Sequence, residues 1–204
     1  MNIDKNEQQD FINDFIAAKA ILEGHFILSS GLHSDKYMQC ALLLKNPKIA
    51  EKTCQALAKK IINQFGENAF DLVLSPAMGG VVVGYELARQ LGLEAIFCER
   101  VNGKFELRRG FEIKKDSRLL IVEDVITTGK SSLETFTLAR NFNANIVAEA
   151  CLVDRSQDKN LDSTLGVPVI SLINLEIRTF DANNIPSDLR NVPAIKPGSR
   201  FINS

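Results

Sequence analysis

The stretch that most constrains the fold of this chain runs from Leu119 to Ser132. It begins with four consecutive apolar residues, which are typical of a short strand buried on both faces, as in a parallel sheet. The acidic pair Glu123–Asp124 follows the strand, and a polar turn rich in Thr, Gly and Ser follows the pair. Ser131 and Glu134 have the spacing of a capping box, which predicts that a helix begins there.

The turn after the acidic pair has the composition of a phosphate-binding loop. Its backbone N–H groups and the positive end of the helix dipole favour a phosphate dianion, and Gly129 lets the backbone approach closely. Its hydroxyl donors belong to Thr127, Thr128, Ser131 and Ser132. Carboxylates repel a phosphate, so the acidic pair must face hydrogen-bond donors, such as the hydroxyls of a ribose, or a divalent cation. A phosphorylated sugar satisfies both halves of the pattern.

Three other interpretations compete with a phosphorylated sugar. The acidic pair could belong to a solvated loop, as two adjacent acids usually do. Residues 129–131 could end a nucleoside-triphosphate P-loop, but that motif requires glycine where Asp124 stands. A dinucleotide-binding fingerprint requires G-x-G-x-x-G after a strand, and the sequence contains none.

A second strand, glycine-rich turn and helix are predicted over residues 71–91. The strand covers residues 71–74, the turn runs from Ser75 to Gly80, and the helix over residues 81–91 is ended by Gly92. Such a turn can bind an anion through its backbone N–H groups, although in isolation it could equally be an ordinary connection. Two such turns in one chain suit a ligand with two phosphate groups.

Residues 122–132 resemble the 5-phosphoribosyl-1-pyrophosphate (PRPP) signature of the type I phosphoribosyltransferases. The resemblance implies an α/β fold, with a central, mainly parallel sheet flanked by helices in one domain over residues 1–204. It implies a pyrophosphate loop formed by Ala77, Met78, Gly79 and Gly80. It assigns the rest of the PRPP site to Glu123, Asp124, Val125, Ile126, Thr127, Thr128, Gly129, Lys130 and Ser131.

The N-terminal region narrows the resemblance to the orotate phosphoribosyltransferases. An amphipathic pattern predicts a helix over residues 9–22, and residues 24–38 are expected to be extended with a turn near residues 30–31. Composition alone indicates only an edge hairpin there. Its Phe-x-Leu-x-Ser-Gly-x-x-Ser pattern resembles the family's hood, about residues 20–45, which covers the pyrimidine. Family members often carry lysine at the position of Ser29, and Lys36 is a candidate substitute.

Residues 99–115 form the most charged stretch, with an Asn102–Gly103 turn that favours a hairpin. Most charge runs are solvated surface. The position of this one resembles the family's mobile catalytic loop, which reaches into the partner subunit of a dimer and compensates the charge of the departing pyrophosphate. We expect Arg100 and Lys104 to be its catalytic cations, with Arg108 and Arg109 in reserve.

Arg155 follows a predicted strand over residues 145–153. It could simply pair with Asp154 or Asp158. In orotate phosphoribosyltransferases, an arginine in this context holds the substrate carboxylate, a bidentate role that suits guanidinium. The resemblance therefore implies that Arg155 and Thr127 face orotate. One departure is Gly79, where many orotate enzymes have lysine.

Composition excludes several other classes of protein. A net charge of −1 gives no footprint for nucleic acid, and no apolar run is long enough for a membrane span. Four scattered cysteines suggest reduced thiols in the cytoplasm, and two histidines exclude a histidine-rich metal centre. We expect no preformed metal site, because Mg²⁺ would arrive with PRPP, whose phosphates it prefers.

The implied reaction is the transfer of phosphoribosyl from PRPP to orotate in pyrimidine biosynthesis, by a homodimer. No nucleophile is needed, because orotate is already an anion. The carboxylates of Glu123 and Asp124 would orient the ribose hydroxyls and favour the positive charge that develops on the ring, with Asp124 as the catalytic residue of the two. Two alternatives stay open: a phosphoribosyltransferase for a purine base, and a non-catalytic PRPP sensor.

Overall fold

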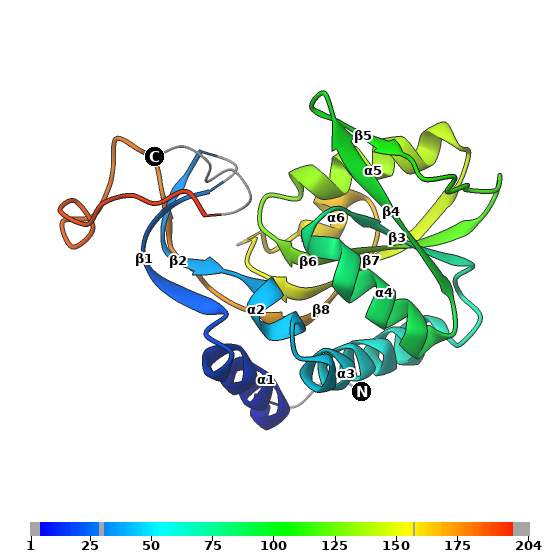
Figure 1. Ribbon diagram of the computed structural model, residues 1–204, viewed down its shortest axis with the longest axis horizontal. Coiled ribbons are helices and arrows are strands. Elements are labelled where there is room, and N and C mark those ends of the chain that lie inside the picture. The colour runs from blue at the N-terminus through cyan, green and yellow to red at the C-terminus, as the bar shows by residue number, and fades with distance from the viewer. Residues whose placement is uncertain (1–4, 29–30, 157, 198–204) are drawn as a thin grey trace.

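Six strands form the large sheet of the computed structural model, which describes residues 5–28, 31–156 and 158–197 (Figure 1). Their spatial order is β5 (Lys104–Leu107), β4 (Glu94–Val101), β3 (Leu72–Pro76), β6 (Arg118–Ile126), β7 (Asn145–Asp154) and β8 (Val169–Asn174). All neighbouring pairs are parallel except β4 and β5. The mainly parallel sheet expected from the sequence is confirmed.

Helices cover both faces of this sheet (Figure 1). One apolar core contains side chains of α1 (Lys5–Ala17), α2 (Cys40–Leu44), α3 (Pro47–Phe65) and α4 (Gly79–Leu91). The other contains side chains of α5 (Lys130–Asn141) and α6 (Leu161–Leu165). Leu120 and Val122 of β6 point into the first core, and Leu119 and Ile121 point into the second. Strand β6 is therefore buried on both faces, as its four apolar residues predict.

Asn46–Pro47 is a sequence pattern that predicts a helix start and Gly66 one that predicts a helix end, and α3 begins and ends at these positions. The Asn46 Oδ1 atom accepts a hydrogen bond from the Lys48 N–H at 3.1 Å, and Pro47 takes the first helical position. Gly66 ends the helix with φ of 86°, a conformation that glycine adopts without a steric cost.

The prediction of a helix over residues 9–22 is wrong at both ends, because α1 covers Lys5–Ala17. The Lys19 N–H donates to the Ile16 carbonyl, and the Ala20 N–H donates to the Phe15 carbonyl, both at 2.9 Å. These two bonds form a Schellman cap in which Lys19, with φ of 54°, takes the place usual for glycine. Gly24, a residue type that often ends helices, lies instead within the next strand.

A smaller, three-stranded sheet lies beside the large one and corresponds to the predicted hood (Figure 1). Strands β1 (Ile21–Ile27) and β2 (His33–Met38) form the expected antiparallel hairpin. The third strand, β9 (Thr179–Phe180), pairs with β2 and was not expected. Ser29, where a family lysine is missing, lies outside the described residues.

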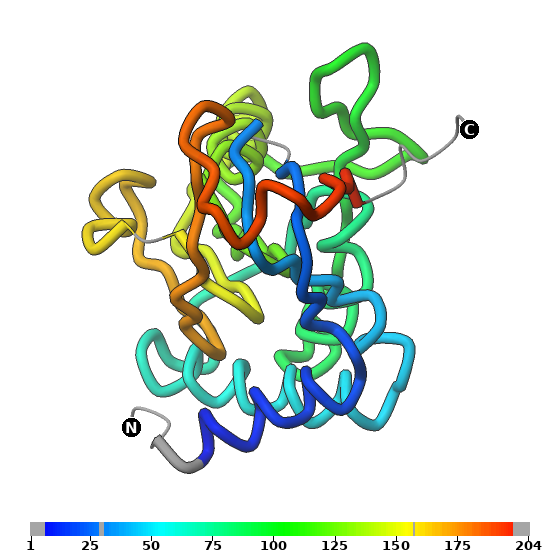
Figure 2. Tube along the Cα trace, turned by 90° about the vertical axis from the view of Figure 1, so that its left-hand side faces the viewer, coloured from blue at the N-terminus to red at the C-terminus, as the bar shows by residue number. Residues whose placement is uncertain are grey.

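The C-terminal segment also packs against the hood (Figure 2). The Ile27 N–H donates to the Ile195 carbonyl, and the Ile195 N–H donates to the His25 carbonyl, both at 2.8 Å. The His25 Nδ1 atom lies 2.9 Å from the Val192 carbonyl oxygen, which can only accept, so Nδ1 carries the proton. The hood is thus built from both ends of the chain.

Strands β4 and β5 form the predicted hairpin in the charged stretch. Val101 pairs with Lys104 across a two-residue turn in which Asn102 and Gly103 both have positive φ. The backbone after β5 is irregular until β6 begins at Arg118. No helix in the described part of the chain is long and apolar enough to cross a membrane.

Candidate active site

Two strand–turn–helix units place their turns next to each other at one edge of the large sheet. Strands β3 and β6 are parallel neighbours, with Leu72 opposite Leu119 and Leu74 opposite Ile121. Their carboxyl ends therefore lead into α4 and α5 at the same edge, where sheets of this kind bind ligands. The predicted pyrophosphate loop, residues 77–80, thus lies beside the predicted phosphate loop, residues 127–131.

Gly79 and Gly80 allow the first turn to approach β6 closely. A Cβ atom on Gly79 would lie 2.6 Å from Asp124 Oδ1, and one on Gly80 would lie 2.8 Å from the Val122 carbonyl oxygen. Both distances are too short for a real contact. The Asp124 carboxylate occupies the space that a side chain at position 79 would need, so this chain cannot carry the family lysine there without moving Asp124. Gly79 thus leaves room for the Asp124 carboxylate.

The second turn leads into α5 without the capping box that the sequence predicts. Gly129 is the N-cap, with φ of 69°, and because it has no side chain it makes no capping hydrogen bond. Ser131 lies inside the helix, where its carbonyl accepts from the Thr135 hydroxyl at 2.9 Å. Glu134 forms an ion pair with Arg100 instead of reaching back to the helix start. The first N–H groups of α5 therefore have no side-chain cap, as an anion-binding helix end requires.

The structure separates the two carboxylates that the sequence places side by side. Because side chains alternate along a strand, Asp124 points towards α4 and Glu123 towards α5. Asp124 is half-buried, and its Oδ1 accepts from the Val125 N–H at 3.0 Å. Glu123 is 7% exposed, and burial, followed by the charges of Asp124 and Glu149, raises its pKa well above the usual range. Asp124 is the carboxylate that remains accessible between the turns.

Glu149 on β7 is a buried acid that sequence reasoning missed. It is fully buried, and neither carboxylate oxygen has a hydrogen-bond partner among the described residues. Burial raises its pKa to about 7, and the nearby Ser132 hydroxyl acts in the opposite direction. The side chains of Glu123 and Glu149 thus lie close together, buried beneath the first turn of α5. The only sequence signal was a charged residue within an apolar strand.

Arg155 lies at the carboxyl end of β7 and points into the hood. It is 4% exposed, its Nη2 donates to Ser34 Oγ at 3.1 Å, and its Nη1 lies 3.4 Å from the Lys36 carbonyl. Pairing with Asp154 or Asp158 does not occur: no ion pair among the described residues includes Arg155. Tyr37 interacts electrostatically with both Arg155 and Asp124. Burial is the main cause that raises the pKa of the Tyr37 hydroxyl, and the negative charge of Asp124 raises it further.

The structure distributes the predicted loop cations unequally. Arg100 forms an ion pair with Glu134, donates to the Gly103 carbonyl at 2.7 Å, and stacks on Phe105. Arg109 binds the carboxylate of Glu99 through two nitrogens, each at 2.8 Å. The side chain of Lys104 is exposed and has no ion pair or hydrogen bond within the described ranges. Arg108 is likewise exposed and has no ion pair among the described residues, so Lys104 and Arg108 are the loop cations most available to an incoming anion.

The remaining predicted residues lie along the two turns. Ala77 donates its N–H to the Cys98 carbonyl of β4 at 2.8 Å, and Met78 is exposed at the start of α4. Ile126 is buried in the second core, while Val125 and Thr127 are half-buried. Thr128 and Lys130 are exposed. The predicted PRPP residues thus form one continuous region of the sheet edge.

Residues 42–184 match the family described as "Phosphoribosyl transferase domain". This match covers more than half of the chain and the whole sheet edge described above. The chain belongs to the phosphoribosyl transferase family.

Its relatives within that family are more specific. An orotate phosphoribosyltransferase from Maricaulis maris is 46% identical over 193 residues, covering 95% of this chain and 97% of the relative. One from Bartonella henselae is 49% identical over 194 residues, covering 95% and 98%. A crystal structure of orotate phosphoribosyltransferase from Aeropyrum pernix superimposes with a TM-score of 0.66 and 25% identity, covering 81% of this chain and 95% of that one. Within the family, the chain groups with the orotate phosphoribosyltransferases.

The contact between position 79 and Asp124 gives a first prediction. The substitution Gly79→Ala should displace the Asp124 carboxylate, because the new Cβ atom would lie 2.6 Å from Asp124 Oδ1. Overpacking of this kind costs about 1–3 kcal/mol. We expect the affinity for PRPP to fall about tenfold or more, measured by isothermal titration calorimetry. Gln55→Ala on the exposed face of α3 is the matched control. Unchanged PRPP affinity in the Gly79 variant would show that the close approach is not required.

The buried Glu149 gives a second prediction, on stability against pH. Its pKa rises from 4.5 to about 7 on folding, so the native protein holds this proton more tightly than the unfolded chain. Stability is then highest below the unfolded pKa, falls as pH rises between the two values, and levels off above about 7.

Glu149→Gln keeps the shape of the side chain and removes the titration. Between pH 5 and pH 8, the free energy of unfolding should therefore rise for the variant relative to the unmodified protein, by about 2–3 kcal/mol. Urea denaturation at both pH values measures this difference. Exposed Glu94→Gln is the control. Parallel pH profiles for the Glu149 variant and the unmodified protein would contradict the prediction.

Proposed function

We propose that this chain transfers the 5-phosphoribosyl group from PRPP to N1 of orotate, giving orotidine 5′-monophosphate and pyrophosphate in pyrimidine biosynthesis. The observation that carries the proposal is the juxtaposition of two anion-binding turns, with Asp124 between them and the buried cation of Arg155 beside them under the hood. The activity named for its relatives supports the same reaction. The four cysteines of this chain are buried and not in disulfide bonds, which suits a reducing cytoplasm.

Each part of the edge has a distinct role in this reaction. The turn at residues 127–131 and the start of α5 hold the 5-phosphate through backbone N–H groups. The turn at residues 77–80 and the start of α4 hold the pyrophosphate. Asp124 orients the ribose hydroxyls and stabilises positive charge on the ring as the bond from C1 to pyrophosphate breaks. Arg155 and Thr127 orient orotate so that N1 faces C1.

The charged loop compensates the leaving group. Pyrophosphate carries away the bonding electrons, so nearby cations lower the barrier more in the transition state than in the ground state. Lys104 is exposed and unpaired in the described structure, whereas Arg100 must exchange Glu134 for the phosphate oxygens. Closure of the loop also excludes water from the reacting carbon.

Mg²⁺ enters this scheme with PRPP. The described residues contain no group of three or more His, Cys, Asp or Glu side chains that could hold a metal ion. The half-buried Asp124 is the protein group that would lie beside an ion held mainly by PRPP oxygens and water. When bound, the ion neutralises charge on the pyrophosphate.

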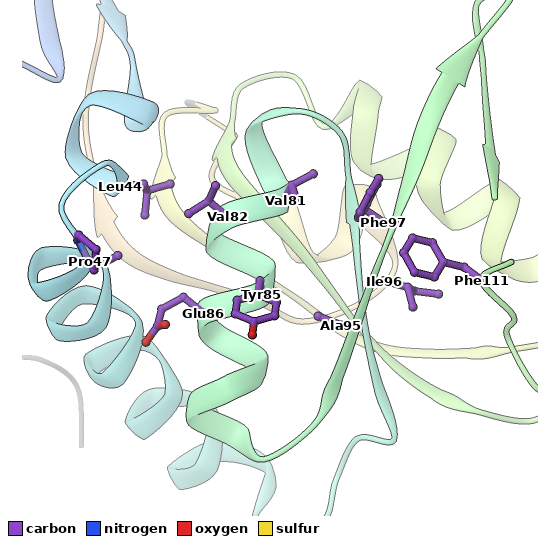
Figure 3. Close-up of a pocket in the computed structure, with 11 residues that line it drawn as sticks. Leu44, Pro47, Val81, Val82, Tyr85, Glu86, Ala95, Ile96, Phe97 and Phe111 are labelled. Carbon is purple, nitrogen blue, oxygen red and sulfur yellow. The ribbon is translucent and has the colours of Figure 1, made fainter. Parts of the chain in front are cut away.

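An apolar groove of about 480 Å³ suits the interface of a homodimer (Figure 3). Figure 3 shows Val82 and Tyr85 of α4 on one side and Phe97 and Phe111 on the other. Tyr85 is 68% exposed, and Met78 at the start of α4 is 77% exposed. Because Phe111 belongs to the charged loop, a second copy seated on this groove would contact that loop. This arrangement supports a catalytic loop shared between subunits.

The reaction is tested by following orotate absorbance after addition of PRPP and Mg²⁺, with adenine, hypoxanthine and uracil in parallel. We expect the orotate signal to fall only when PRPP and Mg²⁺ are both present. Consumption of a purine base without orotate turnover would retain the PRPP site and overturn the assignment of Arg155. PRPP binding without turnover of any base would indicate a sensor.

Lys104→Ala tests the loop cation. Loss of one charge that acts on the leaving group should lower kcat about 100-fold, with little change in the KM for orotate. Steady-state kinetics at saturating PRPP measure both constants, and Lys59→Ala on the exposed face of α3 is the control. An equal loss in the control, or a loss confined to KM, would contradict a catalytic role.

The dimer is tested by placing a charge in the groove. Tyr85→Arg should convert a dimer to a monomer at micromolar concentration, because an unpaired cation in an apolar interface is costly. Sedimentation velocity measures the mass, and exposed Gln55→Arg on α3 is the control. A dimer that persists in the Tyr85 variant would place the interface elsewhere.

A further inference from the structure

Ser34 on β2 joins three separate parts of the chain through one hydroxyl group. It is fully buried, and its Oγ lies 2.9 Å from the Arg178 carbonyl, 3.1 Å from Arg155 Nη2 and 3.3 Å from the Lys36 N–H. A carbonyl oxygen can only accept, so the single hydroxyl proton of Ser34 is donated to Arg178. The two lone pairs of Ser34 then accept from Arg155 and from Lys36. Each hydrogen-bonding position of the hydroxyl is thus used.

The guanidinium of Arg155 is a buried cation without a carboxylate partner in the described structure. Burial lowers its pKa, and the negative charge of Asp35 acts in the opposite direction. The ion pair of Asp35 is with Arg178, whose Nε donates to Asp35 Oδ2 at 2.7 Å, and not with Arg155. A buried charge that lacks a partner is costly, and a bound anion removes that cost.

Ser34 holds this cation in one orientation. The contact of Arg155 Nη1 with the Lys36 carbonyl is long, at 3.4 Å, so the bond from Nη2 to Ser34 is the better of the two. A guanidinium group has five N–H donors, and these two contacts use two of them. Three donors, including one on each terminal nitrogen, remain for a carboxylate. Ser34 therefore fixes the fork without blocking bidentate binding.

We propose that Ser34 is a positioning residue for the base substrate: its hydroxyl, oriented by the Arg178 carbonyl, holds the Arg155 guanidinium ready for a carboxylate. This inference rests on the proposed function, and it adds a residue of the hood that acts through Arg155 instead of touching substrate. Preorganisation of this kind raises affinity because less freedom is lost on binding. The hood thereby contributes to selection of a carboxylated base.

A double-mutant cycle on Ser34→Ala and Arg155→Ala tests the proposal. We expect Ser34→Ala to raise the KM for orotate about 5- to 20-fold, with the KM for PRPP and kcat within about twofold of the unmodified enzyme. In the Arg155→Ala background, the same change should alter the orotate KM less than about twofold, because the group that Ser34 orients is gone. Thr53→Val, which removes another buried hydroxyl, is the control.

Other outcomes overturn the proposal in distinguishable ways. If the two substitutions multiply in their effects on the orotate KM, Ser34 acts independently of Arg155. If both KM values and kcat change together, its role is structural. Ser34→Cys, which keeps the size of the side chain and weakens the acceptor, replaces the alanine variant if that variant does not fold, and it must show the same selective rise in orotate KM. If the unmodified enzyme turns over orotate and the Ser34 variant has the same orotate KM, this inference alone is overturned. If the unmodified enzyme does not turn over orotate, the proposed function is overturned as well.

Discussion

The parallel pairing of β3 with β6 is the constraint on which the rest of the site depends. It brings the starts of α4 and α5 to one edge of the sheet, so two helix dipoles and two sets of backbone N–H groups lie at the same edge. The pairing also requires the first turn to pass close to the end of β6. Gly79 and Gly80 meet this requirement, and the space left at position 79 is occupied by the Asp124 carboxylate.

Charge is divided between the faces of the sheet at this edge. On the α5 side, Glu123 and Glu149 are buried together, and burial raises both of their pKa values. On the hood side, Arg155 is a buried cation with neutral partners. Asp124 lies between these regions and is the more accessible carboxylate. A ligand with phosphates at one end and a carboxylated base at the other suits this distribution, because each part meets backbone N–H groups or a cation.

The sequence predicted several features that arise from local pattern, although not the start of α5, where the expected capping box of Ser131 and Glu134 does not form. The apolar run of β6, the cap at Asn46 and the turn at Asn102–Gly103 each involve only neighbouring residues, and each is confirmed. The end of α1 was missed, because Lys19 adopts a left-handed conformation that pattern reading assigns to glycine. Residue type alone does not predict the backbone conformation at such a position.

The site shows the same division. Composition indicated the turns at residues 75–80 and 127–131, the family resemblance narrowed the first to residues 77–80, and the sheet places the two side by side. The reason for Gly79 was not apparent, because the Asp124 carboxylate that excludes a side chain there lies far along the chain. The burial of Glu149 and the contact of Arg155 with Ser34 likewise depend on strands that meet only after folding. Residue type indicated the chemistry of the site, whereas its exclusions and hydrogen bonds came from the fold.

The composition of the hood has a consequence for synthesis on the ribosome. The large sheet is complete once β8 ends at Asn174, whereas the hood needs β9 and the backbone contact with Ile195. Chains are made from the N-terminus, and domains fold as they emerge. The hairpin of β1 and β2 can form from local sequence, whereas the hood is complete only when residues 179–195 are available. Completion of the hood around Arg155 therefore waits for the C-terminal part of the chain.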